Sequence, residues 1–421
     1  MGATLMQANM LALAFCMPSM QAFAAEGPAI DLQELVNRTP TGGVLHLASG
    51  QYAGPIKIDR PLILEGDAGA NITASGVGSV ITVSAPDATV RNLTIRGSGF
   101  DLEQMDSGIF LEQAASRARV EANILENNLF GIYVHGAEDA IVKSNLIVGN
   151  RPERLSEAGN GVTVWNAPGA QVLDNDIRFG RDGLFVISSR NNIFRGNTMR
   201  DLRYAVHYMY ASDSIVSGNV SIGNHIGFAI MFSPRLEVVG NLSRHDTNYG
   251  LMFNFANYST VRDNIVLDGP QKCLFIYDAN FNTFYRNWFE KCDIGVHFTA
   301  GSEQNAIFDN VFIQNRTQVK YVGTRFVEWS KSRRGNYWSD NPAFDLDGDG
   351  IADVVYRPND IIDRVIWKAP LAKMLANSPA VQLLRWAQSQ FPVLQTGGVV
   401  DSAPLMRPIH IDPPSALGRL K

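Results

Sequence analysis

Apolar and polar positions repeat along the chain from residue 108 to residue 322, each repeat holding a short apolar run and then a polar turn. A small residue opens each run, and an asparagine follows about fourteen residues later. The interval is 22 or 23 residues, apart from one of 30. The small residues are Gly108, Gly131, Gly161, Gly183, Ala205, Gly227, Gly250, Cys273 and Gly295. The asparagines are Asn123, Asn145, Asn175, Asn197, Asn219, Asn241, Asn264, Asn287 and Asn310.

This periodicity predicts an all-β fold, a right-handed parallel β-helix. Ankyrin and tetratricopeptide repeats are longer and helical, and the L-x-x-L-x-L spacing of leucine-rich repeats is absent. In a β-helix each rung of about 22–23 residues lies about 4.8 Å above the previous one, so equivalent residues stack in columns. We therefore expect the asparagines to form a ladder of side-chain amides that satisfies backbone groups at one turn.

The ends of the repeat divide the chain into three segments. Residues 1–24 contain an apolar run that ends in Ala22-Phe23-Ala24, which is typical of a signal peptide, although no Lys or Arg precedes the run. Residues 25–340 are expected to form the β-helix domain. Residues 341–421 are expected to form a C-terminal extension with an acidic loop, amphipathic helical pieces and an extended tail rich in proline.

Two parts of this division are less regular than the central repeats. Residues 25–100 contain short β-branched runs between Gly, Asp and Asn clusters, which favours irregular first coils. In the extension, residues 369–391 have a helical pattern that Pro379 interrupts, so we expect one or two short helices there.

The strand after each small residue has two faces of different composition. Its first and third residues are uniformly apolar and are expected to point into the coil. Its second and fourth residues then point outwards, and they are rich in aromatic residues, Met and His, which is typical of a surface that binds a ligand or partner. The two outward columns are Phe110, Tyr133, Thr163, Phe185, His207, Ala229, Met252, Phe275 and His297, and Glu112, His135, Trp165, Ile187, Met209, Met231, Asn254, Tyr277 and Thr299.

A candidate metal site lies on this outward face. His207 and Met209 lie two residues apart on one strand, Met231 stacks over Met209, and Met252 lies one rung further in the neighbouring column. Strand geometry places these side chains within about 5–7 Å of one another. Thioether and imidazole donors select Cu(I) over calcium, magnesium or manganese. The residues alone favour the alternative that the Met-rich face is an adaptable docking surface for another protein.

A second candidate metal site is the acidic loop of the extension. Asp345, Asp347, Asp349 and Asp353 occupy positions 1, 3, 5 and 9 of a pattern that resembles a calcium loop of the EF-hand type, with Gly350 at position 6. Position 12 is a tyrosine rather than the bidentate glutamate. The pattern therefore predicts weak, structural calcium binding, and the alternative is an acidic turn without an ion.

Charge and composition argue against two other classes of function. The chain has 36 Lys and Arg against 41 Asp and Glu, a formal charge of −5, so we expect no nucleic-acid partner. An exported β-helix can also be a polysaccharide lyase, hydrolase or epimerase, but such enzymes need clustered carboxylates, Lys, Arg or His. The outward columns contain one carboxylate, Glu112, and no Lys or Arg. A carbohydrate-active protein therefore stays only as an alternative.

The two cysteines of the mature chain are expected to remain separate. Cys273 occupies the small-residue column, whereas Cys292 precedes the next small residue by three positions. An oxidising compartment would permit a disulfide, but the two residues are not in register. We therefore expect two small buried thiols.

Several motifs of the chain go beyond what a β-helix requires. They are RYAVHYMYAS from residue 203, GNYWSDNPAFDLDGDGIADVVYRPNDIIDRVIW from residue 335 and NSPAVQLLRWAQSQFPV from residue 377. With these motifs the chain resembles the NosD family, the periplasmic maturation proteins of nitrous oxide reductase. The resemblance covers nearly the whole chain after residue 24, and its C-terminal third is the most specific part.

The resemblance implies a periplasmic protein, not an enzyme, that handles copper while the copper cluster of nitrous oxide reductase is assembled. It implies as partners the permease and ATPase of an inner-membrane ABC transporter, a copper chaperone and the reductase, with membrane contact through the permease only. Under it, the patch of His207 and the three methionines would receive or present Cu(I), and the tail after Asp353 would dock the permease. Two alternatives stay open: a sulfur species as the transported cargo, and a scaffold that only docks proteins.

Overall fold

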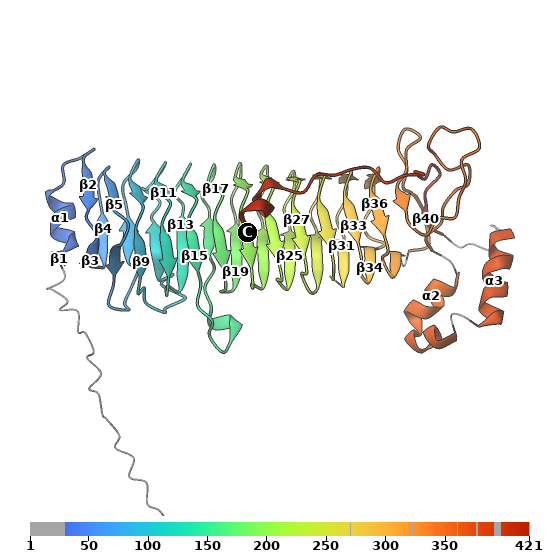
Figure 1. The fold of residues 1–421 in the computed structure, drawn as a ribbon, viewed down its shortest axis with the longest axis horizontal. Helices are drawn as coiled ribbons and strands as arrows, with labels where there is room; N and C mark the ends of the chain where they lie inside the picture. Colours follow the sequence, from blue (N-terminus) through green and yellow to red (C-terminus); the bar gives the residue numbers. More distant parts are fainter. Residues whose placement is uncertain are drawn as a thin grey trace, which may run out of the picture.

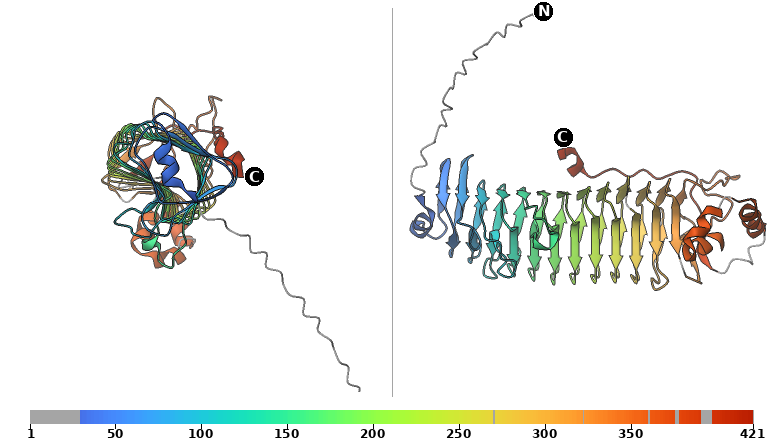
Figure 2. Two further views of the ribbon diagram at one scale, coloured as in Figure 1. Left: turned by 90° about the vertical axis from the view of Figure 1, so that its left-hand side faces the viewer. Right: turned by 90° about the horizontal axis from the view of Figure 1, so that it is seen from below.

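The computed structural model describes residues 30–269, 271–321, 323–359, 361–375, 378–390 and 397–420. The expected signal peptide, residues 1–24, lies outside them. The described chain winds into a long rod of stacked coils, the predicted right-handed parallel β-helix (Figure 1). Three parallel sheets, here called sheets I, II and III, run along the rod and give it a three-sided cross-section (Figure 2).

Sheet I has fourteen strands. They are β1 (Ile30–Asp31), β3 (Gly50–Ala53), β6 (Ala70–Thr73), β9 (Thr94–Arg96), β12 (Ile124–Glu126), β15 (Leu146–Val148), β18 (Asp176–Arg178), β21 (Thr198–Arg200), β24 (Val220–Ile222), β27 (Leu242–Arg244), β30 (Ile265–Leu267), β33 (Trp288–Glu290), β36 (Val311–Ile313) and β39 (Tyr337–Trp338).

Sheet II has twelve strands, which include the longest of the coil. They are β4 (Ile56–Ile58), β7 (Ile81–Val83), β10 (Ser107–Leu111), β13 (Phe130–His135), β16 (Val162–Trp165), β19 (Asp182–Ile187), β22 (Tyr204–Met209), β25 (Ile226–Met231), β28 (Tyr249–Asn254), β31 (Lys272–Tyr277), β34 (Ile294–Phe298) and β37 (Thr317–Tyr321). These are the strands that follow the small residues.

Sheet III also has twelve strands. They are β2 (Val44–Leu47), β5 (Ile63–Gly66), β8 (Thr89–Arg91), β11 (Arg119–Glu121), β14 (Ile141–Lys143), β17 (Gln171–Leu173), β20 (Ile193–Arg195), β23 (Ile215–Ser217), β26 (Glu237–Val239), β29 (Thr260–Arg262), β32 (Thr283–Tyr285) and β35 (Ala306–Phe308). Each rung passes from sheet II to sheet III to sheet I, so the inward residues of all three sheets form one continuous core.

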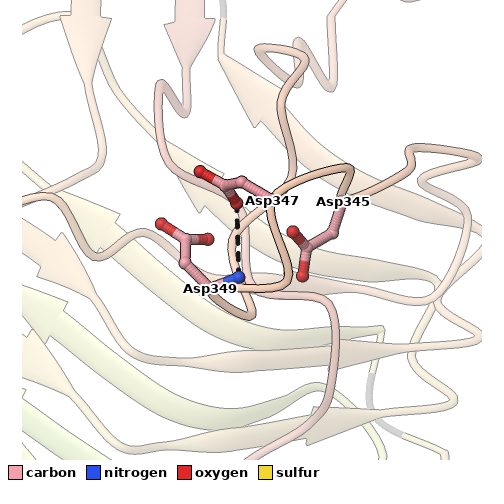
Figure 3. Close-up of side chains that lie close together, drawn as sticks. All are labelled: Asp345, Asp347 and Asp349. Atoms are coloured by element: carbon pink, nitrogen blue, oxygen red, sulfur yellow. Dashed lines mark hydrogen bonds between the residues drawn. The ribbon is translucent and has the colours of Figure 1, made fainter.

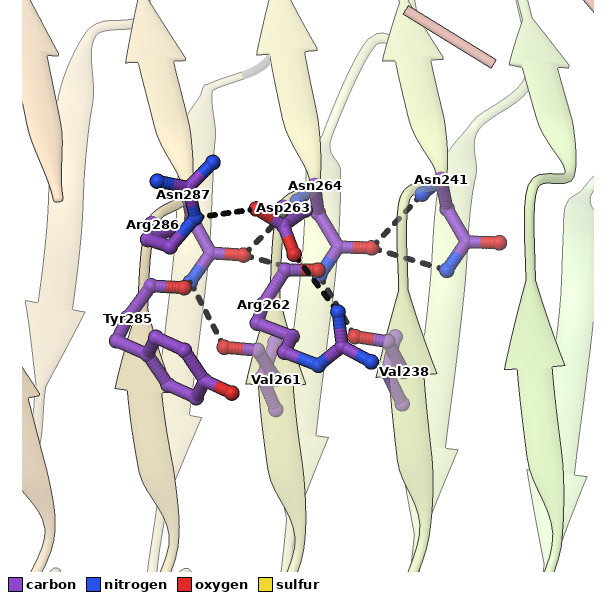
Figure 4. Close-up of polar contacts among 9 residues, drawn as sticks. All are labelled: Val238, Asn241, Val261, Arg262, Asp263, Asn264, Tyr285, Arg286 and Asn287. Atoms are coloured by element: carbon purple, nitrogen blue, oxygen red, sulfur yellow. Dashed lines mark hydrogen bonds and ion pairs between the residues drawn. The ribbon is translucent and has the colours of Figure 1, made fainter. Parts of the chain in front are cut away.

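The asparagine column forms the expected ladder. The Asn241 amide donates to Asn264 Oδ1 at 2.9 Å, and the Asn264 amide donates to Asn287 Oδ1 at 2.9 Å (Figure 4). Each amide also donates to a carbonyl of a neighbouring coil, as Asn264 does to Val238 at 2.8 Å. The ladder extends past the predicted column to Asn336. It satisfies turn groups that the sheets leave unpaired, which is why these polar side chains can be fully buried.

The small-residue column has a packing cause. Beside the glycines of this column, side chains of the same rung point into the coil from a strand of sheet I or from the turn that follows it. A Cβ added at Gly108 would lie 2.9 Å from Asn128 Nδ2, and one added at Gly227 would lie 2.8 Å from Asp246 Oδ2. Only a very small side chain fits there without displacing its neighbour.

The same turn position brings the two cysteines together. Cys292 lies in the turn that follows Cys273, and the two form a disulfide with their Cα atoms 5.7 Å apart. The prediction that they stay separate is therefore wrong. The two cysteines need not occupy one column, because Cys292, in the turn after β33, lies beside the small residue that begins its own rung.

The N-terminal end of the coil is closed by a short helix, α1 (Leu32–Arg38), which the sequence analysis did not identify. Asp31 caps it by accepting hydrogen bonds from the backbone N–H groups of Gln33 and Glu34. Its Leu32 and Val36 are buried against the core. The first coils are more regular than expected, because β1 to β9 pair in parallel within the same three sheets.

The C-terminal end is closed by residues of the extension. Strand β40 (Gly398–Val400) pairs with β38 (Phe326–Glu328), and the buried Asp401 follows directly. Asp401 Oδ2 accepts hydrogen bonds from Asn336 N at 2.7 Å and from Trp338 Nε1 at 2.8 Å. The asparagine ladder thus ends on a carboxylate that the extension supplies.

The rest of the extension is partly helical, as predicted for residues 369–391, although α2 lies before that range and was not predicted. It contains α2 (Ile361–Lys368), the 3-10 helix η2 (Pro370–Leu375), and α3 (Pro379–Gln390), in which Pro379 is the first residue. The tail then returns along sheet I and ends in the 3-10 helix η4 (Ser415–Leu420) (Figure 1). Its Ile411 and Ala416 pack on Val220, Leu242 and Ile265 of sheet I. Among the described helices, none has the length and apolar character that crossing a bilayer requires.

Candidate functional site

The outer face of sheet II has the alternation that the sequence predicts. On β22, Val206 and Tyr208 are fully buried in the core, whereas Met209 is half-buried at the surface. On β25, Phe228 and Ile230 are buried in the same way, and Met231 is half-buried. The face is therefore an accessible surface made largely of aromatic, Met and His side chains.

Met209 and Met231 are direct neighbours across this face. They are register partners in the parallel pairing of β22 with β25. Neighbouring strands lie about 4.8 Å apart, which is within reach of two flexible thioether side chains that share one ion. The structure thus brings together the two residues that the sequence places at the centre of the soft-metal patch.

His207 and Met252 are brought near the pair but not next to each other. The register places Ala229 opposite His207 on one side and opposite Met252 on the other. Ala229 is 0% exposed although it belongs to an outward column. The side chains around it therefore close over this alanine, and His207 and Met252 flank it from the two adjacent rungs.

His207 is held more firmly than a surface histidine. It is 8% exposed, and its Nδ1 lies 2.9 Å from Oδ2 of Asp182, a residue of the neighbouring strand β19 that is 1% exposed. Arg203 donates to both oxygens of the same carboxylate, at 2.8 and 2.6 Å. Burial alone would raise the pKa of Asp182, but the hydrogen bonds from His207 and Arg203 outweigh it and hold that pKa below its ordinary value.

Aromatic rings enclose the same histidine. The ring of Phe185 lies 4.8 Å from the imidazole of His207, and the ring of Tyr204 meets it edge-on at 4.9 Å. Asp182, Arg203 and Tyr204 were not among the sequence candidates. They precede the small residue of their rung, whereas both predicted outward columns lie after it. A column drawn one residue before each small residue would have included Asp182 and Tyr204.

A second feature that the sequence analysis missed is a row of exposed aromatic residues beside the methionines. Tyr210, Phe232 and Phe255 directly follow the outward Met209, Met231 and Asn254, and all three have positive φ, between 49 and 51°. Their rings are stacked with centroids 5.1 Å apart. Bulky residues rarely adopt this left-handed conformation, which costs about 1–2 kcal/mol each.

The other histidines do not join the Met209/Met231 pair. His135 lies against Trp165, with ring centroids 4.3 Å apart, and burial lowers its pKa. At the opposite end of the face, burial and the nearby Lys272 and Lys320 lower the pKa of His297 to about 4. His225 and His245 lie at the edge of sheet I, where they contact Thr247 and the Asp268 carbonyl.

Two long rungs, whose extra residues lie in segments 93–107 and 146–160, border the N-terminal half of the face. The first lines a cleft with Asp101, Gln104 and Asp106, which also contains Phe110 and Glu112 of sheet II. The second carries the 3-10 helix η1 (Leu155–Glu157). Glu112 forms an ion pair with Lys57 at 3.3 Å. Glu112 is thus paired and Asp182 is buried and hydrogen-bonded, so neither carboxylate is free for proton transfer.

The acidic loop of the extension gathers three of its four predicted ligands. One oxygen from each of Asp345, Asp347 and Asp349 lies within 4.8 Å of the others (Figure 3). Asp345 also accepts hydrogen bonds from the N–H groups of Gly348 at 2.7 Å and Gly350 at 2.9 Å. Asp353 instead accepts from Leu346 N at 2.7 Å and is not part of the cluster.

Comparison with known proteins finds two family models that match the chain. A family model described as "Periplasmic copper-binding protein (NosD)" matches residues 151–343, which include the Met209/Met231 pair. A second model, for right-handed β-helix regions, matches residues 69–177.

Two relatives match most of the chain. A "Probable ABC transporter binding protein NosD" of Stutzerimonas stutzeri is 42% identical over 375 residues, which cover 86% of each chain. One of the same description from Pseudomonas aeruginosa is 41% identical over 383 residues, covering 88% of this chain and 90% of the relative. Among solved structures, a family 28 exopolygalacturonase of Yersinia enterocolitica superposes with a TM-score of 0.54 at 12% identity, over 71% of this chain and 78% of that one. That likeness concerns the fold alone.

Proposed function

The chain belongs to the NosD family of periplasmic copper-binding proteins, and from this premise we propose that the centre of sheet II is a transfer site for Cu(I). The observation that carries the proposal is the direct pairing of Met209 with Met231 on an accessible face, beside His207 and Met252. Two thioethers and an imidazole form a soft donor set, which suits Cu(I) and does not suit Ca²⁺ or Mg²⁺.

The site has the features of a transfer site rather than of a storage site. Met209 and Met231 are half-buried on an open face of the coil, so a second protein can approach the ion directly. The ion passes between proteins when ligands of the acceptor replace those of the donor, and this requires that the ligands be reachable. No covalent or redox step of this chain is needed.

The partners proposed for the site are proteins. Copper would come from a chaperone and leave for nitrous oxide reductase, whose copper cluster is being assembled, and the protein would work in the periplasm with the permease and ATPase of an ABC transporter. The stacked row of Tyr210, Phe232 and Phe255 beside the methionines supports a protein contact here, because exposed aromatic residues are enriched at protein interfaces.

The helical part of the extension is the proposed contact with the permease. Leu371 and Met374 of η2 are 84% and 85% exposed, and Leu383 of α3 is 63% exposed. Large apolar side chains that are exposed together are typical of a surface that is covered in a complex. We propose that the membrane is contacted only through this partner.

A Cu(I) titration under anaerobic conditions, with a chromogenic chelator as competitor, tests the metal site. The variant Met209→Leu/Met231→Leu keeps the side-chain volume but removes both sulfur atoms. We expect it to lose at least tenfold in affinity for Cu(I). The matched control is Met199→Leu, because Met199 is fully buried inside the coil and cannot reach a metal on the surface. Equal affinity of the double variant and the control would refute the site.

A copurification experiment tests the partner. The variant Leu371→Ser/Met374→Ser, coexpressed with the cognate permease and ATPase, is expected to lose its transporter while its Cu(I) affinity is unchanged. Retention of the transporter by this variant would exclude η2 as the contact. Retention of reductase maturation by the Met209→Leu/Met231→Leu variant would instead favour a scaffold that only docks proteins.

A further inference from the structure

The contacts of His207 determine which of its nitrogen atoms can bind a metal. Nδ1 lies 2.9 Å from Asp182 Oδ2 and 3.4 Å from Nη2 of Arg203. The first contact requires a proton on Nδ1, because an unprotonated Nδ1 would direct its lone pair at a carboxylate oxygen. The contact with Arg203 would instead require an unprotonated Nδ1 that accepts through its lone pair, since a guanidinium only donates. The shorter contact with a charged acceptor is the stronger one, so Nδ1 carries the proton.

With Nδ1 protonated, a neutral His207 has its lone pair on Nε2. The structure shows no hydrogen bond from a described residue to this atom. Arg203 fixes the carboxylate through two parallel hydrogen bonds, and the rings of Phe185 and Tyr204 confine the imidazole from two sides. The ring is thus restrained in both tautomer and orientation before any ligand binds.

The histidine lies one rung from a buried alanine that has sulfur-containing side chains beside it. Its register partner Ala229 has only a methyl side chain, and Met252 follows on the far side of that alanine. Met231 lies two residues along the strand from Ala229. The residues around Ala229 therefore supply an imidazole and two thioethers.

We infer that Asp182, held by Arg203, is the positioning residue that fixes His207 as the Nδ1–H tautomer and makes Nε2 its ligand atom for Cu(I). The inference rests on the proposed copper site and specifies which nitrogen atom of His207 binds the ion. A hydrogen bond from a metal-binding histidine to a carboxylate is a general way of orienting the ring, and its loss typically reduces metal affinity by about 10–100-fold.

The tautomer is tested in the apo protein, without copper. Long-range ¹⁵N–¹H correlation spectra of protein labelled at its seven histidines distinguish the two neutral forms. The His207→Gln variant assigns the signal. We expect the Nδ1–H form for His207 in the wild type. The Nε2–H form would overturn the inference, whatever the protein does with copper.

The variant Asp182→Asn tests the role of the carboxylate. Its amide oxygen still accepts from Arg203, but the amide NH₂ then faces Nδ1 as a donor, so the histidine is expected to change to the Nε2–H tautomer. Cu(I) affinity should fall about 10–100-fold. Because Nη2 of Arg203 loses its acceptor, the melting temperature should also fall, so the tautomer of the apo variant is the readout that separates orientation of the ring from loss of stability. The matched control is Asp176→Asn, which removes two Arg–Asp ion pairs on sheet I, with Arg178 and Arg200, that involve no histidine.

The outcomes separate this inference from the proposed function. If the wild type does not bind Cu(I), the proposed function fails and the assigned role of Asp182 fails with it. If the wild type binds Cu(I) and Asp182→Asn binds it equally well, only the inference is overturned. If Asp182→Asn does not fold, the tautomer of the wild type still decides whether the carboxylate orients the ring.

Discussion

Met209 and Met231 lie directly opposite each other in the parallel pairing of β22 with β25, one rung apart on the outer face of the coil. In a β-helix this arrangement is held by the backbone hydrogen bonds of two buried strands. The separation of the two backbone positions is therefore set by the spacing of the rungs, and the proposed metal site would present both methionines side by side before an ion binds.

The single variants Met209→Leu and Met231→Leu test whether the methionines act as a pair. If both sulfur atoms bind one Cu(I), each single change should weaken the affinity about tenfold, or about 1.4 kcal/mol. The double change should then reduce the free energy of Cu(I) binding by less than the sum of the two single changes, because either single change already disrupts the shared site. Chelator competition measures all three variants, and strict additivity would argue for two independent sulfur contacts.

The asparagine ladder is expected to be a main source of stability. Asn241 is buried, donates to Val216 O and Asn264 Oδ1, and accepts from Asn219. The change Asn241→Ala leaves several buried polar groups without partners, at about 1–3 kcal/mol each. We expect a clear decrease in the urea midpoint followed by circular dichroism. The exposed Asn37→Ala on α1 serves as the control and should change the midpoint little.

Asp246 is expected to make stability depend on pH. It is fully buried and accepts hydrogen bonds from Ser221, Ser243 and Asn224 N, and burial raises its pKa to about 6. The folded state then holds the proton more tightly than the unfolded state, so stability is highest below about pH 4 and falls as the pH rises to about 6. The variant Asp246→Asn should melt at a higher temperature than the wild type at pH 7.

Melting curves between pH 4 and pH 7 check the sign of this effect. The melting temperature should depend less steeply on pH in Asp246→Asn than in the wild type. Some dependence should remain, because burial also raises the pKa of Asp401 to about 6. A variant that melts below the wild type at pH 7, with an unchanged pH slope, would show that Asp246 is not the group that titrates.

The disulfide between Cys273 and Cys292 should stabilise the coil. It closes a loop with a sequence separation of 19 residues, for which chain entropy gives about 3 kcal/mol. The variant Cys273→Ala/Cys292→Ala should therefore unfold at a lower denaturant concentration. A reducing agent should lower the denaturant midpoint of the wild type but should not change that of the variant. The absence of a shift in both would mean that the bond adds no stability.

The acidic loop should bind Ca²⁺ weakly, with a dissociation constant of about 10⁻⁴–10⁻³ M. Only three carboxylates converge, and hydrogen bonds from Gly350 and Gly348 already engage Asp345 and hold its pKa below the ordinary value. Calorimetric titration measures the affinity, and Asp347→Asn/Asp349→Asn should abolish it. Removal of Ca²⁺ with a chelator should leave Cu(I) binding unchanged. If the double variant still released heat on addition of Ca²⁺, the ion would bind at another site.

The architecture could be predicted because a β-helix repeats its requirements in every rung. The small-residue and asparagine columns each recur nine times, so register, facing and the Met209/Met231 contact followed from spacing. The disulfide and the Asp182–His207 bond could not be predicted in this way. The disulfide joins Cys273 to a turn whose path the period does not determine. Asp182 lies on the strand next to that of His207, but it precedes the small residue and so falls outside the predicted outward columns. The helix α1 and the residues that close the C-terminal end each occur once, so no repeat in the sequence predicts them.

The pairing of β38 with β40 has a mechanical consequence for the helices α2 and α3, which lie between these strands in the chain. The helical segment is not a free tail but a loop with both ends fixed to the last rungs of the rod. A partner that pulls or rotates these helices therefore loads the strand pair and Asp401 together. Movement of the partner would be transmitted to the rigid coil as a whole, and the surface of sheet II would move with it.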